Sequence, residues 1–203
     1  MGLTESSQLP LGSRLPKFAL VDTLSQALVR SEDFAGQALL VAVICNHCPY
    51  VAHIKQGLAQ LGNKLSAKRI FTLAVSANDP RLSPIDAPEK MALDARIYGY
   101  GFPYLFDADQ TFCRDLRAAC TPEFFLFDPW ARLVYRGQMD DARPSNDLPV
   151  DGHDLLAAAD ALLVGAPPVD LQKPSMGCSI KWRPENYPVY LQTPQRLGVP
   201  LMR

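Results

Sequence analysis

The apolar run in QALLVAVI, residues 37–44, constrains the fold of this chain more than any other stretch. A continuous run of this length is typical of a strand that is buried on both faces of a sheet. The run ends at Cys45, and the segment after Pro49 has apolar residues at 51, 54, 58, 61 and 65, which is the spacing of one buried helical face. The sequence therefore predicts a buried strand that leads through a Cys-x-x-Cys turn, Cys45 to Cys48, directly into a helix.

Further segments extend this unit into an α/β domain. The apolar segment 69–76 predicts a second strand, so strand, helix and strand form a parallel unit with a right-handed crossover. Later segments predict a helix over 88–99, an antiparallel hairpin over 123–137 and a closing helix over 151–165. We expect a central mixed sheet of four or five strands, flanked by helices.

Length and hydropathy indicate one compact domain with two attached segments. The 203 residues contain no apolar stretch near the length of a membrane span, and the start lacks the basic cluster and apolar core of a secretory signal. We expect a cytoplasmic protein with a mobile leader over 1–14, a domain over 15–165 and a proline-rich C-terminal arm over 166–203 that packs on the domain.

Charge and cysteine content narrow the function. Twenty basic and 21 acidic residues, with no basic run, argue against a nucleic-acid or membrane partner. Five cysteines are an odd number and too few for a disulfide-stapled secreted domain. In a reducing compartment such thiols are more often catalytic or metal-binding than structural.

A set of motifs in order along the chain is similar to one family. The motifs are CNHCPYV, SANDP, DAPEKM, FPYLFD, CTPEFFLFD, LVYRGQMDDARPSN and KPSMGCSIKW. From about Leu15 to Trp182 the chain resembles the thioredoxin-like redoxins of the alkyl hydroperoxide reductase/thiol-specific antioxidant group, in their thioredoxin-family branch. This resemblance implies a thioredoxin-like fold and thiol-disulfide chemistry in cellular redox homeostasis.

The cysteine pair is the first candidate site. A sulfur at a strand-helix junction lies near free N–H groups and the positive end of the helix dipole, which favour the thiolate. We expect Cys45 to start the first helical turn as the more exposed nucleophile, and Cys48 to be the resolving thiol one turn in. His47 is expected to stabilise the Cys45 thiolate; the alternative is a solvated loop histidine. Leu39 stands where thioredoxins have a buried acid, so proton transfer must use water, His47 or a group from another loop.

The second element is ACTPEFF. By resemblance, the Thr121–Pro122 bond is cis and lies against the cysteine pair, with the preceding backbone open to a substrate chain; the alternative is a trans proline that enters an edge strand. Cys120, two residues before the proline, is a possible accessory thiol.

Cys178 is the other possible accessory thiol. Ile180 and Trp182 beside it need a buried environment if the arm is ordered. We therefore expect the arm to bring Cys178 within about 10 Å of Cys45 or Cys120.

Together these features predict a thiol-disulfide oxidoreductase that cycles Cys45 and Cys48. Its partners are expected to be a disulfide-bearing protein, or a small-molecule disulfide or peroxide, and an unidentified thiol reductant; no cofactor and no metal are expected. One alternative is a thiol-dependent peroxidase, although Ala42 and Cys45 occupy the positions where peroxiredoxins have threonine three residues before the nucleophile. Another is a Cys/His metal-binding protein, for which a second closely spaced cysteine pair is missing.

Overall fold

The computed structural model of the protein describes residues 3–7, 9–168 and 172–192, which form two sheets and the helices around them. The larger sheet has seven strands in the order β3-β2-β6-β5-β4-β8-β9. Its strands are β2 (Ala19–Asp22), β3 (Leu28–Arg30), β4 (Ala38–Val43), β5 (Ile70–Ser76), β6 (Tyr104–Phe106), β8 (Glu123–Phe127) and β9 (Leu133–Gly137). The smaller sheet has the order β1-β10-β7 and consists of β1 (Leu3–Glu5), β10 (Met176–Ser179) and β7 (Cys120–Thr121).

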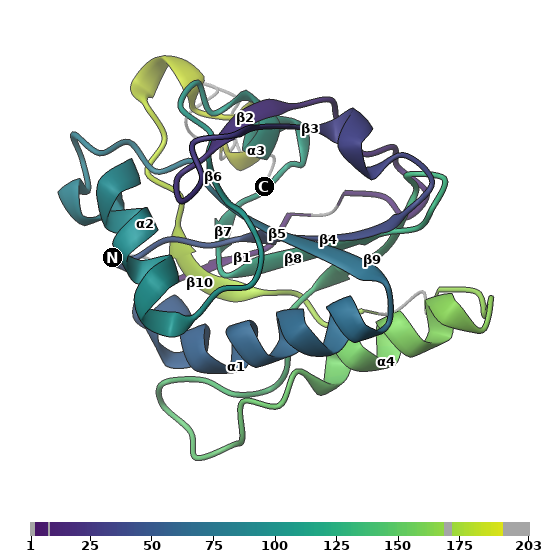
Figure 1. The fold of residues 1–203 in the computed structure, drawn as a ribbon. Helices are drawn as coiled ribbons and strands as arrows, with labels where there is room; N and C mark the ends of the chain where they lie inside the picture. Colours follow the sequence, from purple (N-terminus) through teal and green to yellow (C-terminus); the bar gives the residue numbers. More distant parts are fainter. Residues whose placement is uncertain (1–2, 8, 169–171, 193–203) are drawn as a thin grey trace, which may run out of the picture.

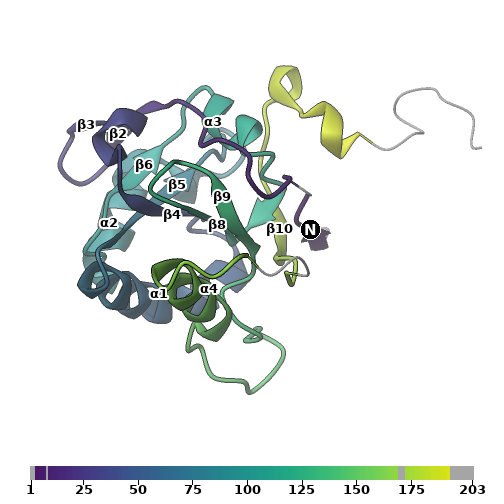
Figure 2. The same cartoon turned by 90° about the vertical axis from the view of Figure 1, so that its right-hand side faces the viewer.

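Within the described residues, four α-helices and four short 3-10 helices accompany the sheets. They are α1 (Pro49–Ala67), α2 (Pro88–Tyr98), α3 (Thr111–Asp115), α4 (His153–Leu163), η1 (Ser31–Phe34), η2 (Pro84–Asp86), η3 (Pro184–Asn186) and η4 (Val189–Leu191). Helices α1 and α4 lie together on one side of the large sheet and α3 lies on the other, as Figures 1 and 2 show from two directions.

Strand β4 lies inside the large sheet between two neighbours, parallel to β5 and antiparallel to β8. All six of its residues are buried, because each face of the sheet is covered. Leu40 and Ala42 belong to the apolar core that includes α1, and Leu39 and Val41 belong to the core on the opposite face. The predicted strand, helix and parallel strand are therefore confirmed.

The predicted apolar face of α1 is also confirmed, since positions 51, 54, 58, 61 and 65 are all buried. The predicted hairpin over 123–137 is present as β8 and β9. The expected number of four or five strands was too small, and the strand that the sequence did not indicate is β3, which pairs antiparallel with β2 at one edge of the sheet. A strand of three residues is too short for an alternating pattern to be visible in the sequence.

A strand near the N-terminus pairs with a strand of the C-terminal arm in the smaller sheet. Residues 3–5, within the segment expected to be a mobile leader, form β1, which pairs with β10 from the arm. After β10 the arm continues along the domain, where Ile180 and Trp182 are buried in the core on the α3 side (Figure 2). Residues 1–2 and 8 of the leader, and 169–171 and 193–203 of the arm, lie outside the described residues.

No helix in the described part of the chain is long and apolar enough to cross a membrane.

Candidate functional site

The cysteine pair lies between the end of β4 and the start of α1. Helix α1 begins at Pro49, so Cys48 is its N-cap residue and Cys45 lies outside the helix. The expectation that Cys45 starts the first turn is wrong, because a proline without an N–H group is well suited to the first helical position and the helix begins there. Cys48 is therefore the sulfur next to the free N–H groups and the positive end of the helix.

Neither thiol of the pair is exposed. Cys45 and Cys48 both have 0% relative exposure, so the expectation of a more exposed Cys45 is wrong. Thr121 covers the pair: its Oγ1 lies 3.1 Å from Cys45 Sγ, and its carbonyl oxygen lies 3.2 Å from Cys48 Sγ.

The Thr121–Pro122 peptide bond is cis, as the resemblance implies. The backbone before it is not open to a substrate chain, however, because β10 occupies that position. Cys178 pairs with Thr121, and Ser179 pairs with Cys120. The arm thus brings Cys178 beside the cysteine pair.

Cys48 is the thiol whose surroundings favour ionisation. The hydrogen bond from the Cys45 thiol has the largest effect and lowers the pKa of Cys48 to about 4, against the opposing effect of burial. The thiol and the backbone N–H of Cys178 also lower the pKa of Cys48. The backbone N–H of Val51 lowers it as well, although its geometry is not that of a helix-capping hydrogen bond. A protonated Cys48 has the carbonyl of Thr121 as its acceptor, whereas the thiolate has these several donors, so the thiolate is favoured.

Cys45 has the opposite tendency. Burial raises its pKa far above the ordinary value, and donation of its hydrogen to Cys48 and the negative charge of Asp86 act in the same direction. The surroundings therefore favour the thiolate at Cys48 and the thiol at Cys45, whereas the thiolate was expected at Cys45 from the sequence.

His47 is held by a buried carboxylate. Its Nδ1 lies 2.6 Å from Oδ2 of Asp86, a residue of η2 with 0% exposure. Burial tends to raise the pKa of Asp86, but hydrogen bonds from His47, Ser83, Asn78 and the backbone of Asn46 outweigh it and lower the pKa to about 2. Asp86 is thus ionised and fixes the orientation of the imidazole ring.

Sequence reasoning missed Asp86. It lies within the quoted motif DAPEKM, but nothing in the local pattern indicates that the carboxylate points back toward a residue 39 positions earlier. Asp86 is a carboxylate from another loop that contacts His47, whereas the position of Leu39 has no acid.

Cys45, His47 and Asp86 form a compact arrangement. One ligand-type atom of each residue lies within 4.8 Å of those of the other two, and Nε2 of His47 has no hydrogen-bond partner among the described residues. A sulfur beside a histidine that is oriented by a carboxylate is the usual arrangement for moving a thiol proton. A structural zinc site needs four ligands, and Asp86 already accepts N–H groups on both oxygens, so these residues fit proton transfer better than metal binding.

The remaining thiols differ in their surroundings. Cys113 and Cys120 are fully buried, and burial raises the pKa of each far above the ordinary value. Burial and donation to Cys48 raise the pKa of Cys178 to about 12. Beside Cys120, the fully buried Glu123 accepts the backbone N–H of Ala119 at 2.8 Å, and burial raises its pKa to about 8. Sequence reasoning missed this carboxyl group as well, because it stands within an apolar strand.

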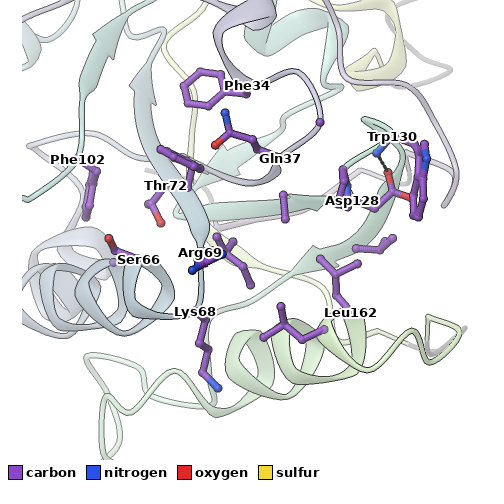
Figure 3. A pocket seen from close by; sticks show the side chains of 18 of the residues that line it. Phe34, Gln37, Ser66, Lys68, Arg69, Thr72, Phe102, Asp128, Trp130 and Leu162 are labelled. Carbon is purple, nitrogen blue, oxygen red and sulfur yellow. Dashed lines mark hydrogen bonds between the residues drawn. The ribbon is translucent and has the colours of Figure 1, made fainter.

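A large hollow of about 1280 Å³ lies at the other end of the sheet (Figure 3). It is lined by the first residues of β4 and β5, the end of α1 and the turn around Trp130, and no cysteine contributes to it. The cysteine pair follows the opposite end of β4, so this hollow is separate from the thiol site.

Comparison with known proteins identifies the family of the chain. The model of the AhpC/TSA family matches residues 11–136. An uncharacterized conserved protein from Geobacillus kaustophilus is 45% identical, with a TM-score of 0.88 over 91% of this chain and 98% of that one. A hypothetical protein from Sinorhizobium meliloti 1021 is 43% identical, with a TM-score of 0.86 over 89% of this chain and 99% of that one.

A more distant structure shares the fold alone. A putative thiol:disulfide interchange protein DsbE from Chlorobium tepidum is 20% identical, with a TM-score of 0.60 over 77% of this chain and 99% of that one. The comparison with curated proteins found no match. The family match over more than half of the chain, together with the buried cysteine pair, shows that this chain belongs to the AhpC/TSA family of thioredoxin-like redoxins and has a thiol-based redox function.

Proposed function

We propose that the protein is a thiol-disulfide oxidoreductase that cycles Cys45 and Cys48 between dithiol and disulfide. The observation that carries this proposal is the position of the Cys48 sulfur. It lies at the N-cap of α1, and the adjacent thiol of Cys45 donates to it. A thiolate with a second thiol in contact has both the nucleophile and the resolving group that disulfide exchange requires.

The two thiols have different tasks in the reduction of a disulfide. The Cys48 thiolate attacks one sulfur, the substrate S–S bond breaks, and one substrate thiolate leaves. Cys45 then transfers its proton to His47 and attacks the Cys48 sulfur, which forms the Cys45–Cys48 disulfide and releases the second substrate thiolate. Asp86 holds His47 in place and stabilises the imidazolium during this step.

The partners follow from the chemistry and from the closed surroundings of the site. The substrate is a disulfide, on a protein or a small molecule, and an external thiol reductant regenerates the dithiol. Because β10 pairs with β7, an extended peptide has no free strand edge beside Thr121. This arrangement favours small or locally exposed disulfides as substrates.

Disulfide mapping tests the proposal. Trypsin is expected to leave Cys45 and Cys48 in one peptide, residues 31–55. After mild oxidation, that peptide should lose two hydrogens in the wild type and in Cys113→Ser, a matched control with a buried cysteine outside the pair. In Cys48→Ser, the peptide contains Cys45 as its single cysteine, so mild oxidation should not remove two hydrogens from it. This variant should not reduce a disulfide substrate.

Peroxidase activity is the competing outcome, and membership of the AhpC/TSA family is the observation that favours it. The same variants are therefore assayed for consumption of hydrogen peroxide with excess dithiothreitol. Disulfide reduction that depends on Cys48 without comparable peroxide consumption supports the oxidoreductase. Rapid peroxide consumption by the wild type, lost in Cys48→Ser and without disulfide reduction, replaces the proposal by a peroxidase.

A further inference from the structure

Strand β10 holds a third sulfur at the cysteine pair. It lies between β1 and β7, with Cys178 paired to Leu3 on one side and to Thr121 on the other. Gly177 allows the close approach of β10, because a Cβ atom there would lie 1.9 Å from the carbonyl oxygen of Thr121. Backbone pairing on both sides thus fixes the position of Cys178.

Thr121 is the common neighbour of three sulfurs. Its hydroxyl contacts Cys45, its carbonyl contacts Cys48, and Cys178 is its partner across the strands. The thiol and the N–H of Cys178 both interact with the Cys48 sulfur. Cys48 therefore has two neighbouring sulfurs, Cys45 and Cys178, with which it can exchange.

Exposure distinguishes these two neighbours. Cys45 and Cys48 have 0% exposure, as do Cys113 and Cys120, whereas Cys178 has 6%. All five cysteines of the chain are in the described part, and Cys178 alone among them has measurable exposure. Cys178 is also buried, but of the five cysteines it is the residue with the most contact with solvent.

We propose that Cys178 is the exchange thiol through which the buried Cys45–Cys48 pair reacts with external disulfides, by way of a Cys48–Cys178 disulfide. This inference rests on the proposed oxidoreductase function, and it changes one step of it: Cys178, in place of Cys48, makes the first attack on the external disulfide. The substrate class is a small-molecule disulfide, because Cys178 has only 6% exposure and is paired on both sides.

Three exchanges balance the reaction. Cys178 passes its proton to Cys48 and attacks the external disulfide, and the first substrate thiolate leaves and takes that proton. The regenerated Cys48 thiolate attacks the Cys178 sulfur, forms the Cys48–Cys178 disulfide and releases the second substrate thiolate. Cys45 transfers its proton to His47 and attacks Cys48, and Cys178 leaves as a thiolate that His47 reprotonates. Overall, two electrons pass from the Cys45–Cys48 dithiol to the external disulfide.

The experiment uses 2-hydroxyethyl disulfide as the probe on the full-length protein. In Cys45→Ser, where the last exchange is blocked, the peptide 31–55 should become joined to the peptide that contains Cys178. In Cys178→Ser, the Cys45–Cys48 disulfide should form at least tenfold more slowly than in the wild type, while the final product stays the same. Cys113→Ser should react at the wild-type rate.

Two further measurements keep the outcomes distinct. The Cys178→Ser protein retains an N–H and an O–H donor beside Cys48, so thiolate absorbance should show that Cys48 still ionises at low pH. A slower reaction of this variant then reflects the loss of the Cys178 sulfur. Wild-type rates in a folded Cys178→Ser, or a Cys48–probe mixed disulfide as the sole product of Cys45→Ser, would overturn the role of Cys178. Absence of the Cys45–Cys48 disulfide from the oxidised wild type would instead overturn the oxidoreductase proposal.

Discussion

Substitution of Gly177 by alanine tests whether the arm controls the ionisation of Cys48. The added Cβ would lie 1.9 Å from the carbonyl oxygen and 2.8 Å from the carbonyl carbon of Thr121, and neither backbone atom can rotate away. Ordinary contact begins at 3.4 Å, so β10 has to move by roughly 1.5 Å. Such a movement weakens or breaks the hydrogen bonds from the thiol and the N–H of Cys178 to the Cys48 sulfur.

The expected shift follows from the strength of these bonds. A hydrogen bond to a charged group contributes about 1.5–3 kcal/mol, and 1.36 kcal/mol corresponds to one pKa unit, so loss of one bond should raise the pKa by about 1–2 units. The pKa of Cys48, about 4 in the wild type, should therefore rise to about 5–6.

Ultraviolet thiolate absorbance as a function of pH measures this shift without a reagent that must reach the buried sulfur. Cys48→Ser identifies the absorbance that belongs to Cys48. Gly101→Ala is the control substitution, because its Cβ meets only Asn63 Oδ1, at 3.2 Å. A folded Gly177→Ala protein with an unchanged thiolate titration would refute the role of the arm in stabilising the thiolate.

Three other substitutions test the core, the proton path and a buried acid. Leu58→Ala, at a fully buried position of α1, should lower the free energy of unfolding by about 2–5 kcal/mol in urea titration, and a loss below 1 kcal/mol would contradict the packing described. Asp86→Asn should slow the attack of Cys45 on a mixed disulfide by about 10- to 100-fold, measured by rapid mixing, and an unchanged rate would exclude the proton path. The pKa of Glu123 is about 8 in the folded state instead of 4.5, so between these pH values the folded state retains a proton that the unfolded state has lost. The free energy of unfolding therefore falls as the pH rises from 4.5 to about 8. Glu123→Gln should remove a slope of about 1.4 kcal/mol per pH unit from the urea stability curve, and a slope equal to the wild type would refute the raised pKa.

Several features of the protein were evident from the sequence because they depend on neighbours along the chain. The buried strand before Cys45 was visible as an apolar run, and the buried face of α1 as a spacing of three and four residues. The hairpin of β8 and β9 was visible from two apolar segments around a turn. In each case the burial pattern repeats with the period of the secondary structure, so a local window contains the information.

Other features depended on residues that meet only in the folded chain. Asp86 lies beside His47 because η2 follows β5 back to the end of β4, and no periodicity of the sequence predicts that approach. Strand β3, at the edge of the large sheet, was missed for a related reason, since its pairing with β2 supplies the order that three residues cannot show by themselves.

The identity of the ionised cysteine shows most clearly the difference between features that are local in the sequence and features that form only in the folded chain. The spacing of Cys45 and Cys48 indicated an exchange-competent pair, but not which sulfur is the thiolate. That property depends on hydrogen-bond donors within a few ångströms, and Cys48 receives them from Cys45, from the first turn of α1 and from Cys178 in the arm. Only tertiary structure brings β10 against Thr121, so it was the fold that determined the ionisation of Cys48, whereas the sequence by itself determined that a cysteine pair stands between a buried strand and a helix.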